Sequence, residues 1–274
     1  MHLPEPVVRA LRCSVCGEPL GEQGRALRCE RGHSFDLAKQ GYVNLLHAKI
    51  PAGTADTAEM VAARVEFLAA GHYRPLAEAV AAQVARLCPE PGLVVDAGAG
   101  TGYYLAQALP ENSYGLALDV SAIALRRAAK AHPAIGAAVW NLWEPWPVAD
   151  GAASVVLNVF APRNASEFRR VLRPGGALVV VSPNPGHLAE LGSAVLGIGE
   201  DKEQRLDSSL AAHFGLDHRE EISYRLRLEP AAVRQVVGMG PAAHHLHRDG
   251  RAERLAEITE SVEITVSFTL SVFR

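Results

Sequence analysis

The chain has 274 residues, of which 49% are hydrophobic and 21% are charged, and its formal net charge is −3. These values are typical of a globular protein with room for one substantial domain and a small appendage. They exclude a strongly basic protein that coats nucleic acid, and no apolar run approaches the roughly 20 residues that a membrane-spanning helix requires.

Three cysteines and one histidine near the start of the chain have the spacing of a zinc site. Cys13 and Cys16 form a C-x2-C pair, and Cys29 and His33 form a C-x3-H pair after twelve further residues. Two such pairs can close a tetrahedral shell around Zn²⁺. Three cysteines together with one histidine are an odd count for disulfide bridges, and no secretory segment is seen ahead of them, which argues against disulfides. We therefore expect a structural zinc in residues 1–45 and a cytoplasmic location.

A linker and two helices are predicted next. Proline, glycine and small polar residues between 51 and 60 are typical of a linker. Thr57 can cap a helix that stops at Gly71, and an alanine-rich helix follows it over residues 75–87. The predicted divisions are a zinc module over 1–45, a linker and connecting helix over 46–74, and a main domain over 75–274.

Strands and helices then alternate, which predicts a parallel, doubly wound sheet. The helices are expected around YYLAQAL, AIALRRAAKAH and ASEFRRVL. The last third differs, because residues 221–228 and 262–274 alternate like antiparallel edge strands on either side of a helical region. The five strands of the alternating part are expected within residues 92–100, 113–121, 135–143, 151–162 and 173–185.

A glycine-rich loop follows the first of these strands. VVDAGAGTGYY places Asp96 two residues before a G-x-G-x-G run at Gly98, Gly100 and Gly102. Glycines let the backbone approach a ligand closely, although nicotinamide enzymes share this motif. Asp119 closes the next strand, where its carboxylate can accept hydrogen bonds from both ribose hydroxyls. The acid before the glycines favours a methyltransferase over a plain dinucleotide-binding fold.

Several motifs together resemble the RlmA family of 23S rRNA guanine-N1 methyltransferases, in particular its TlrB-like Gram-positive branch. The resemblance covers essentially the whole chain. It is carried by the cysteine-histidine knuckle and by HSFDLAKQGYVNLL, DTAEMVAAR, GHYRPL, DAGAGTGYY, LNVFAP, RPGG and PNPGHLAEL.

The resemblance implies an α/β fold, a class I S-adenosylmethionine methyltransferase with a Rossmann-like mixed sheet and a small N-terminal zinc-binding module. It also implies S-adenosyl-L-methionine as methyl donor, a structural Zn²⁺, a 23S rRNA hairpin as partner, a homodimer and no membrane association. The cofactor-binding residues expected from the motifs and the resemblance are Tyr73, Asp96, Gly98, Gly100, Thr101, Gly102, Asp119, Asn141, Leu142 and His187.

The implied reaction is methylation of N1 of a hairpin guanosine, at nucleotide 748 by resemblance to this branch, with tylosin-type macrolide resistance as a further implication. The alternatives are nucleotide 745, a small-molecule methyltransferase of an antibiotic pathway, and an RNA-binding protein that has lost catalysis. His187 is the first candidate for the base that removes the N1 proton, or else it only anchors the cofactor. Phe160 can stack on an extruded base or equally be a packing aromatic.

Overall fold

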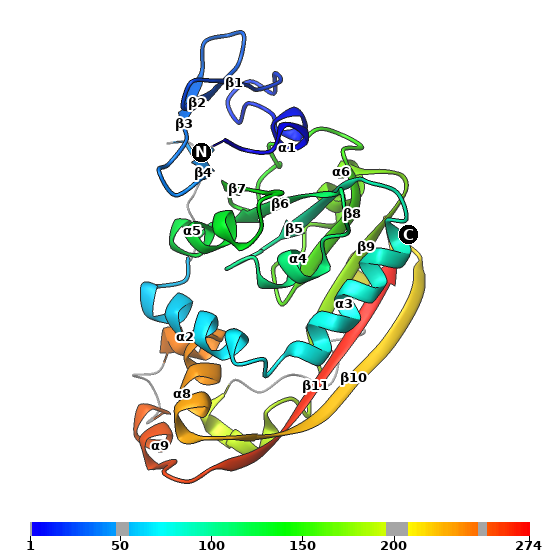
Figure 1. The fold of residues 1–274 in the computed structure, drawn as a ribbon. Helices are drawn as coiled ribbons and strands as arrows, with labels where there is room; N and C mark the ends of the chain where they lie inside the picture. The colour runs from blue at the N-terminus through cyan, green and yellow to red at the C-terminus, as the bar shows by residue number, and fades with distance from the viewer. Residues whose placement is uncertain (1, 48–54, 196–207, 246–250) are drawn as a thin grey trace.

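The computed structural model describes residues 2–47, 55–195, 208–245 and 251–274, and an eight-stranded mixed sheet dominates it (Figure 1). Its parallel strands are β4 (Tyr42–Asn44), β5 (Leu93–Ala97), β6 (Tyr114–Asp119), β7 (Ile135–Val139), β8 (Ala153–Val159) and β9 (Leu172–Pro183). Two antiparallel strands complete it, β10 (Leu216–Leu228) and β11 (Val262–Phe273). The strand order is β10-β11-β9-β8-β5-β6-β7-β4, a Rossmann-like mixed sheet as the sequence predicts.

Both faces of the sheet are covered, and each face has its own apolar cluster. Consecutive residues of β5 alternate between them, so that Val94 belongs to one cluster and Val95 to the other. Such strands are buried on both faces and read as continuous apolar runs. The first face is covered by α3 (Arg74–Leu87), α4 (Tyr103–Ala108) and α5 (Ala122–Ala131), and the second by α1 (Glu5–Ala10) and α6 (Ala165–Val171).

The first 45 residues share the core of the sheet. They form a small antiparallel sheet from β1 (Gly21–Gln23), β2 (Ala26–Arg28) and β3 (Ser34–Asp36), after which β4 joins the edge of the large sheet beside β7. Leu11 and Val43 lie in the same apolar cluster as Val95 of β5. The predicted boundary at residue 45 remains a prediction, but apolar contacts cross it extensively.

Helix α2 (Ala58–Ala69) begins and ends where the sequence predicts. The Thr57 hydroxyl accepts a hydrogen bond from the backbone N–H of Met60 at 3.3 Å, and Gly71 has a positive φ of 80° just beyond the helix. A hydroxyl cap before the first turn and a glycine with positive φ after the last turn are common at helix ends. Of the predicted linker and connecting helix over 46–74, residues 48–54 lie outside the described residues.

The last third contains one strand that the sequence predicts wrongly as an edge. β10 is an edge strand, but β11 lies between β10 and β9, where Ser267 and Thr269 are buried. Their hydroxyls donate to Glu221 and to Asn184, and these hydrogen bonds offset the cost of burying them. The remaining elements are η1 (Ala189–Ala194), α8 (Pro230–Gly238), η2 (Pro241–His245) and α9 (Arg251–Glu257), with α8 packed on α2. None of the described helices is long and apolar enough to cross a membrane.

Candidate active site and zinc site

The glycine loop joins β5 to α4 at the carboxyl edge of the parallel strands. Gly98 and Gly102 have positive φ values of 86° and 76°. A Cβ on Gly98 would lie 2.3 Å from the Cβ of Ala161, and one on Gly102 would lie 2.9 Å from the Cα of Ala128. Both glycines are therefore required by the packing of the protein on itself, in addition to any ligand.

Asp119 connects this loop to the end of β6. Its Oδ2 accepts a hydrogen bond from the N–H of Gly100 at 2.9 Å, and its Oδ1 accepts one from the N–H of Ser121 at 2.8 Å. Burial raises the pKa of Asp119, and these two backbone hydrogen bonds act in the opposite direction. Each carboxylate oxygen keeps a further lone pair, so the side chain can still accept hydrogen bonds from a ligand. Thr101 is buried in the same loop.

Three buried polar atoms around the loop have no hydrogen-bond partner among the residues that the structure describes: Oδ1 of Asp96, the hydroxyl of Tyr104 and Oδ1 of Asn158. Burial raises the pKa of Asp96 to about 8, and the nearby charge of Asp119 adds to this effect. Buried polar groups are normally satisfied, and exceptions cluster where a ligand completes them. A ligand bound at the loop would supply partners for these three atoms.

Tyr73 and His187 meet although 114 residues separate them in the chain. The Tyr73 hydroxyl lies 3.2 Å from Nε2 of His187, and Nδ1 of His187 accepts a hydrogen bond from the backbone N–H of Ser267 at 3.3 Å. Tyr73 is 2% exposed, and burial raises its pKa further above the usual value of a phenol. A chain of ring contacts connects the pair to Tyr104 at the end of the glycine loop: the ring centroids are 5.1 Å apart for Tyr73 and Phe268, 5.1 Å for Phe268 and Phe160, and 6.2 Å for Phe160 and Tyr104.

Asn141 and Leu142 follow β7 and are buried. The Asn141 side chain accepts a hydrogen bond from the N–H of Trp143 at 3.1 Å. Leu142 reaches the glycine loop, since its Cδ1 lies 3.6 Å from the position of a Cβ on Gly98. The structure thus gathers the predicted cofactor residues at one edge of the sheet.

Sequence reasoning missed Arg64 and Asp56, which lie in and just before α2. They form an ion pair, and a guanidinium nitrogen of Arg64 lies 3.2 Å from where a Cβ on Gly100 would be. The only signal in the sequence was their place in the motif DTAEMVAAR, which contributed to the resemblance but received no role.

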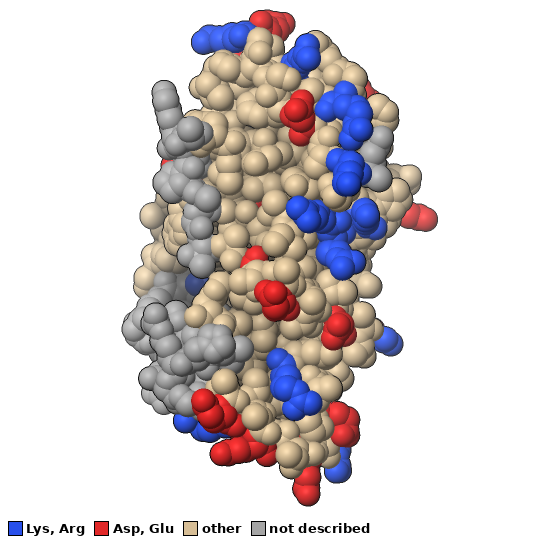
Figure 2. Space-filling view, turned by 90° about the vertical axis from the view of Figure 1, so that its left-hand side faces the viewer, with Lys and Arg blue, Asp and Glu red and all other residues tan. Residues whose placement is uncertain are grey.

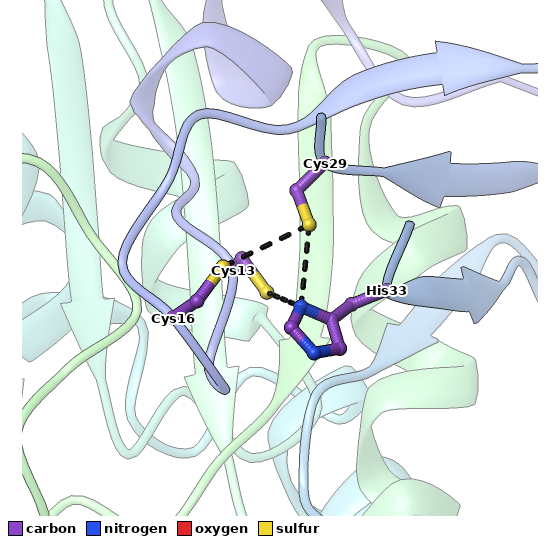
Figure 3. A group of neighbouring side chains, drawn as sticks. All are labelled: Cys13, Cys16, Cys29 and His33. Atoms are coloured by element: carbon purple, nitrogen blue, oxygen red, sulfur yellow. Dashed lines mark hydrogen bonds between the residues drawn. The ribbon is translucent and has the colours of Figure 1, made fainter. Parts of the chain in front are cut away.

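The four predicted zinc ligands converge in the N-terminal module (Figure 3). Their ligand atoms all lie within 4.8 Å of one another, with Nδ1 of His33 at 3.5 Å from Cys13 Sγ and 3.3 Å from Cys29 Sγ. Cys16 Sγ lies 3.8 Å from Cys29 Sγ. Zn–S and Zn–N bonds of about 2.3 and 2.0 Å at tetrahedral angles require edges of about 3.8 and 3.5 Å. The donor set and its spacing therefore fit a closed, structural zinc site.

Comparison with known proteins identifies the family of the chain. The family model described as "RlmA, N-terminal", a zinc ribbon, matches residues 11–50. The 23S rRNA (guanine(748)-N(1))-methyltransferase of Streptomyces fradiae is 48% identical over 98% of this chain and 98% of its own. The chain belongs to the RlmA family of 23S rRNA (guanine-N1)-methyltransferases.

Two further comparisons extend this result. A protein described as "Putative 23S rRNA (guanine-N(1)-)-methyltransferase YxjB", from Bacillus subtilis, is 31% identical over 95% of this chain and 95% of its own. The crystal structure of the MccD protein has a TM-score of 0.50 and 15% identity, and covers 72% of this chain and 96% of that one. The likeness to MccD concerns the fold alone. Family membership supports a 23S rRNA (guanine-N1)-methyltransferase over the small-molecule and non-enzyme alternatives.

As an RlmA enzyme the protein uses S-adenosyl-L-methionine as methyl donor and holds zinc as a structural metal. The residues at the carboxyl edge fit this cofactor. Asp119 offers acceptor lone pairs suited to ribose hydroxyls, and the unpartnered oxygen of Asp96 can accept from an ammonium group. Ligands of this fold bind in the same crevice, outside the carboxyl ends of the strands.

Proposed function

We propose that this protein methylates N1 of the guanosine at nucleotide 748 in a hairpin of 23S rRNA. The observation that carries the proposal is the 48% identity, over nearly the whole chain, to the Streptomyces fradiae enzyme named for that nucleotide. Nucleotide 745 is the alternative position. We further propose that methylation contributes to tylosin-type macrolide resistance, and that the protein acts as a homodimer in the cytoplasm, where its rRNA substrate is assembled.

The cofactor site follows from the predicted residues and their geometry. Asp119 holds the ribose, and Asp96 accepts a hydrogen bond from the methionine end. The backbone of Gly100 and Thr101 lines the cofactor, and Asn141 and Leu142 border the adenine. S-adenosylmethionine supplies an electrophilic methyl group on its sulfonium, and the enzyme's task is mainly to align the acceptor nitrogen with it.

Phe160 is the residue best placed to receive the guanine. It follows β8 with a positive φ of 57°, a strained backbone for a bulky residue, and its side chain is 42% exposed. The turn is held by Asn158, whose Nδ2 donates to the carbonyls of Ala97 at 3.2 Å and Pro162 at 2.9 Å. The hydrogen bonds of Asn158 hold the strained backbone of Phe160 in place. Strained residues of this kind cluster at functional sites, which supports a functional role for Phe160.

The aromatic neighbours of Phe160 support this role. Its ring centroid lies 5.1 Å from that of Phe268, which in turn lies 4.5 Å from the ring of His187, and it makes an edge contact with Tyr104 at 6.2 Å. A guanine in a hairpin must leave its stack to be methylated, and an exposed aromatic ring can stack on the extruded base. We propose that Phe160 does so.

The hydrogen bonds of His187 favour anchoring over base catalysis. Because Nδ1 accepts from the N–H of Ser267, the neutral ring carries its proton on Nε2, which then donates to the oxygen of Tyr73. Neither ring nitrogen is then free to accept the guanine N1 proton. We propose that His187 orients the Tyr73 hydroxyl, which contacts the methionine end of the cofactor.

Replacing Phe160 with leucine should lower kcat/KM for rRNA by about 5- to 100-fold, because stacking of a base on an aromatic ring contributes about 1–3 kcal/mol. Affinity for S-adenosylhomocysteine, measured by calorimetry, should not change. Phe160→Tyr should retain activity. Leu216→Ala is the matched control, since Leu216 is also an exposed apolar residue but lies at the start of the edge strand β10. Equal losses of rRNA turnover and cofactor affinity in Phe160→Leu would assign Phe160 to packing instead.

A basic surface supports binding of a folded RNA. Figure 2 shows Lys and Arg side chains gathered in a column along one side of a face of the molecule. Helix α5 contacts β4, so its charges adjoin those of the zinc module. Phosphate contacts from such side chains position an RNA without reading its sequence. The zinc module exposes Arg25, Arg28, Arg31 and Lys39, and α5 exposes Arg126, Arg127 and Lys130.

Mapping the methylated nucleotide tests the proposed function. The protein is incubated with S-adenosylmethionine and unmodified 23S rRNA, and primer extension locates N1-methylguanosine, which blocks base pairing. We expect a stop at nucleotide 748, and none in an rRNA carrying adenosine there. A stop at 745 would favour the alternative position, and absence of any stop would overturn the proposal. Light scattering of the purified protein tests the homodimer.

A further inference from the structure

The guanidinium group of Arg64 lies against the glycine loop and donates hydrogen bonds to two other parts of the protein. One terminal nitrogen donates to the carboxylate of Asp56, and the other donates to the backbone carbonyl of Met239 at 2.7 Å. The first of these nitrogens also lies 3.2 Å from the position of a Cβ on Gly100. The guanidinium is thus held against the loop by two residues, Asp56, which precedes Arg64 in the chain, and Met239, which follows it.

The segment that carries Arg64 is attached to the cofactor site at a second point. The hydroxyl of Ser121, next to Asp119, donates to the backbone carbonyl of Asp56 at 3.2 Å. Burial raises the pKa of Asp119 and of Tyr104, and the positive charge of Arg64 acts in the opposite direction on both. The charge of Arg64 therefore acts within the site and not only at its rim.

The donors of Arg64 exceed the partners that the fold gives it. A guanidinium has five N–H groups, and within the described part of the chain two are used, by Asp56 and Met239, which leaves three. Asp56 and Arg64 are each less than one quarter exposed, so a third charge near them is only weakly screened. Spare, oriented guanidinium donors in such surroundings are suited to a carboxylate, which they bind through charge-assisted hydrogen bonds.

S-adenosylmethionine contains one carboxylate, at its methionine end, and the carboxylates that line the loop, Asp96 and Asp119, cannot bind it. We propose that Arg64 binds the carboxylate of the methionine moiety, and that Asp56 and the Met239 carbonyl position its guanidinium for this contact. The rival explanation is that Arg64 is only a structural clasp that ties α2 to α8. The two explanations predict different effects of replacing Arg64. If Arg64 binds the carboxylate, only a ligand that carries this group should lose affinity. If Arg64 is a structural clasp, ligands with and without the carboxylate should lose affinity equally.

A ligand pair that differs in the carboxylate alone separates the explanations. S-adenosylhomocysteine carries the carboxylate, whereas S-adenosyl-3-thiopropylamine keeps the amine and lacks it. Binding of each to the full-length protein and to Arg64→Met is measured by calorimetry. We expect Arg64→Met to weaken binding of S-adenosylhomocysteine by about 10- to 100-fold, the range for a charge-assisted hydrogen bond. Binding of the thiopropylamine should change little.

Further variants make the outcome decisive. Arg64→Lys keeps the charge without the paired donors and should lie between the wild type and Arg64→Met. Arg86→Met is the control, because Arg86 is a half-exposed arginine paired with Asp217 away from the loop, and it should affect neither ligand. Equal weakening of both ligands in Arg64→Met and Arg64→Lys would show a clasp, and no weakening would also refute the proposal. Neither ligand requires RNA, so this result is independent of the proposed nucleotide.

Discussion

Replacing Cys29 with serine should abolish methylation of 23S rRNA and lower Tm by roughly 5–10 °C, which corresponds to about 2–4 kcal/mol for a chain of this size. Cys29 is one of four ligands in a closed zinc site, and zinc binding and folding of such a module are coupled. The three-residue strands β1 to β3 have little core of their own, so residues around the site lose their order without the metal.

The measurements are zinc content by mass spectrometry, Tm by calorimetry and rRNA methylation. Affinity for S-adenosylhomocysteine should largely persist, because the cofactor loop lies on other elements. Cys88→Ser is the matched control: Cys88 is also a buried cysteine, but its thiol donates only to the Glu90 carbonyl at 3.2 Å, so zinc and activity should remain. A zinc-free Cys29→Ser protein that methylates rRNA at the wild-type rate would refute the role of the module.

Asp119→Asn should weaken binding of S-adenosylhomocysteine by about 100-fold or more. Both carboxylate oxygens accept backbone N–H bonds, from Gly100 and from Ser121, and an amide would direct N–H groups at one of these donors. The variant therefore loses a contact that shapes the loop as well as a proposed contact to the ribose. Charge-assisted hydrogen bonds contribute about 1.5–3 kcal/mol each, and 1.4 kcal/mol is a factor of ten in affinity.

Calorimetric titration with S-adenosylhomocysteine checks this prediction. Asp150→Asn is the control, because Asp150 is 82% exposed and paired with Arg170 far from the loop, and its affinity should match the wild type. If Asp119→Asn bound the ligand within a few-fold of the wild type, the cofactor would have to be held elsewhere. Circular dichroism should show that both variants keep the fold.

The zinc ligands and the glycine loop were predictable because each is encoded over a short stretch. The C-x2-C and C-x3-H pairs need only local turns to present their ligand atoms, and their spacing requires no knowledge of the rest of the fold. Likewise Asp96 and Gly98 stand in one strand-loop-helix unit whose alternation of apolar runs and glycine predicts its shape.

β11 was misjudged because alternation of polar and apolar residues does not reveal what covers the polar face. Ser267 and Thr269 are polar positions of this alternation, yet their hydroxyls donate to Glu221 of β10 and to Asn184, the residue directly after β9. A serine or threonine hydroxyl costs little to bury once it is hydrogen-bonded, and only the neighbouring strand decides whether it is.

By itself, then, the sequence determined the α/β class, the zinc ligands and the glycine loop, because local spacing and periodicity carry that information. Only the tertiary structure decided that Tyr73 meets His187, that Arg64 lies over Gly100, and that Phe160 is held strained and exposed beside them. These pairings join segments far apart in the chain through sheet order and helix packing. The identity of a side chain does not indicate which distant residue it will contact, because the backbone fold decides which side chains come within a few ångströms of each other.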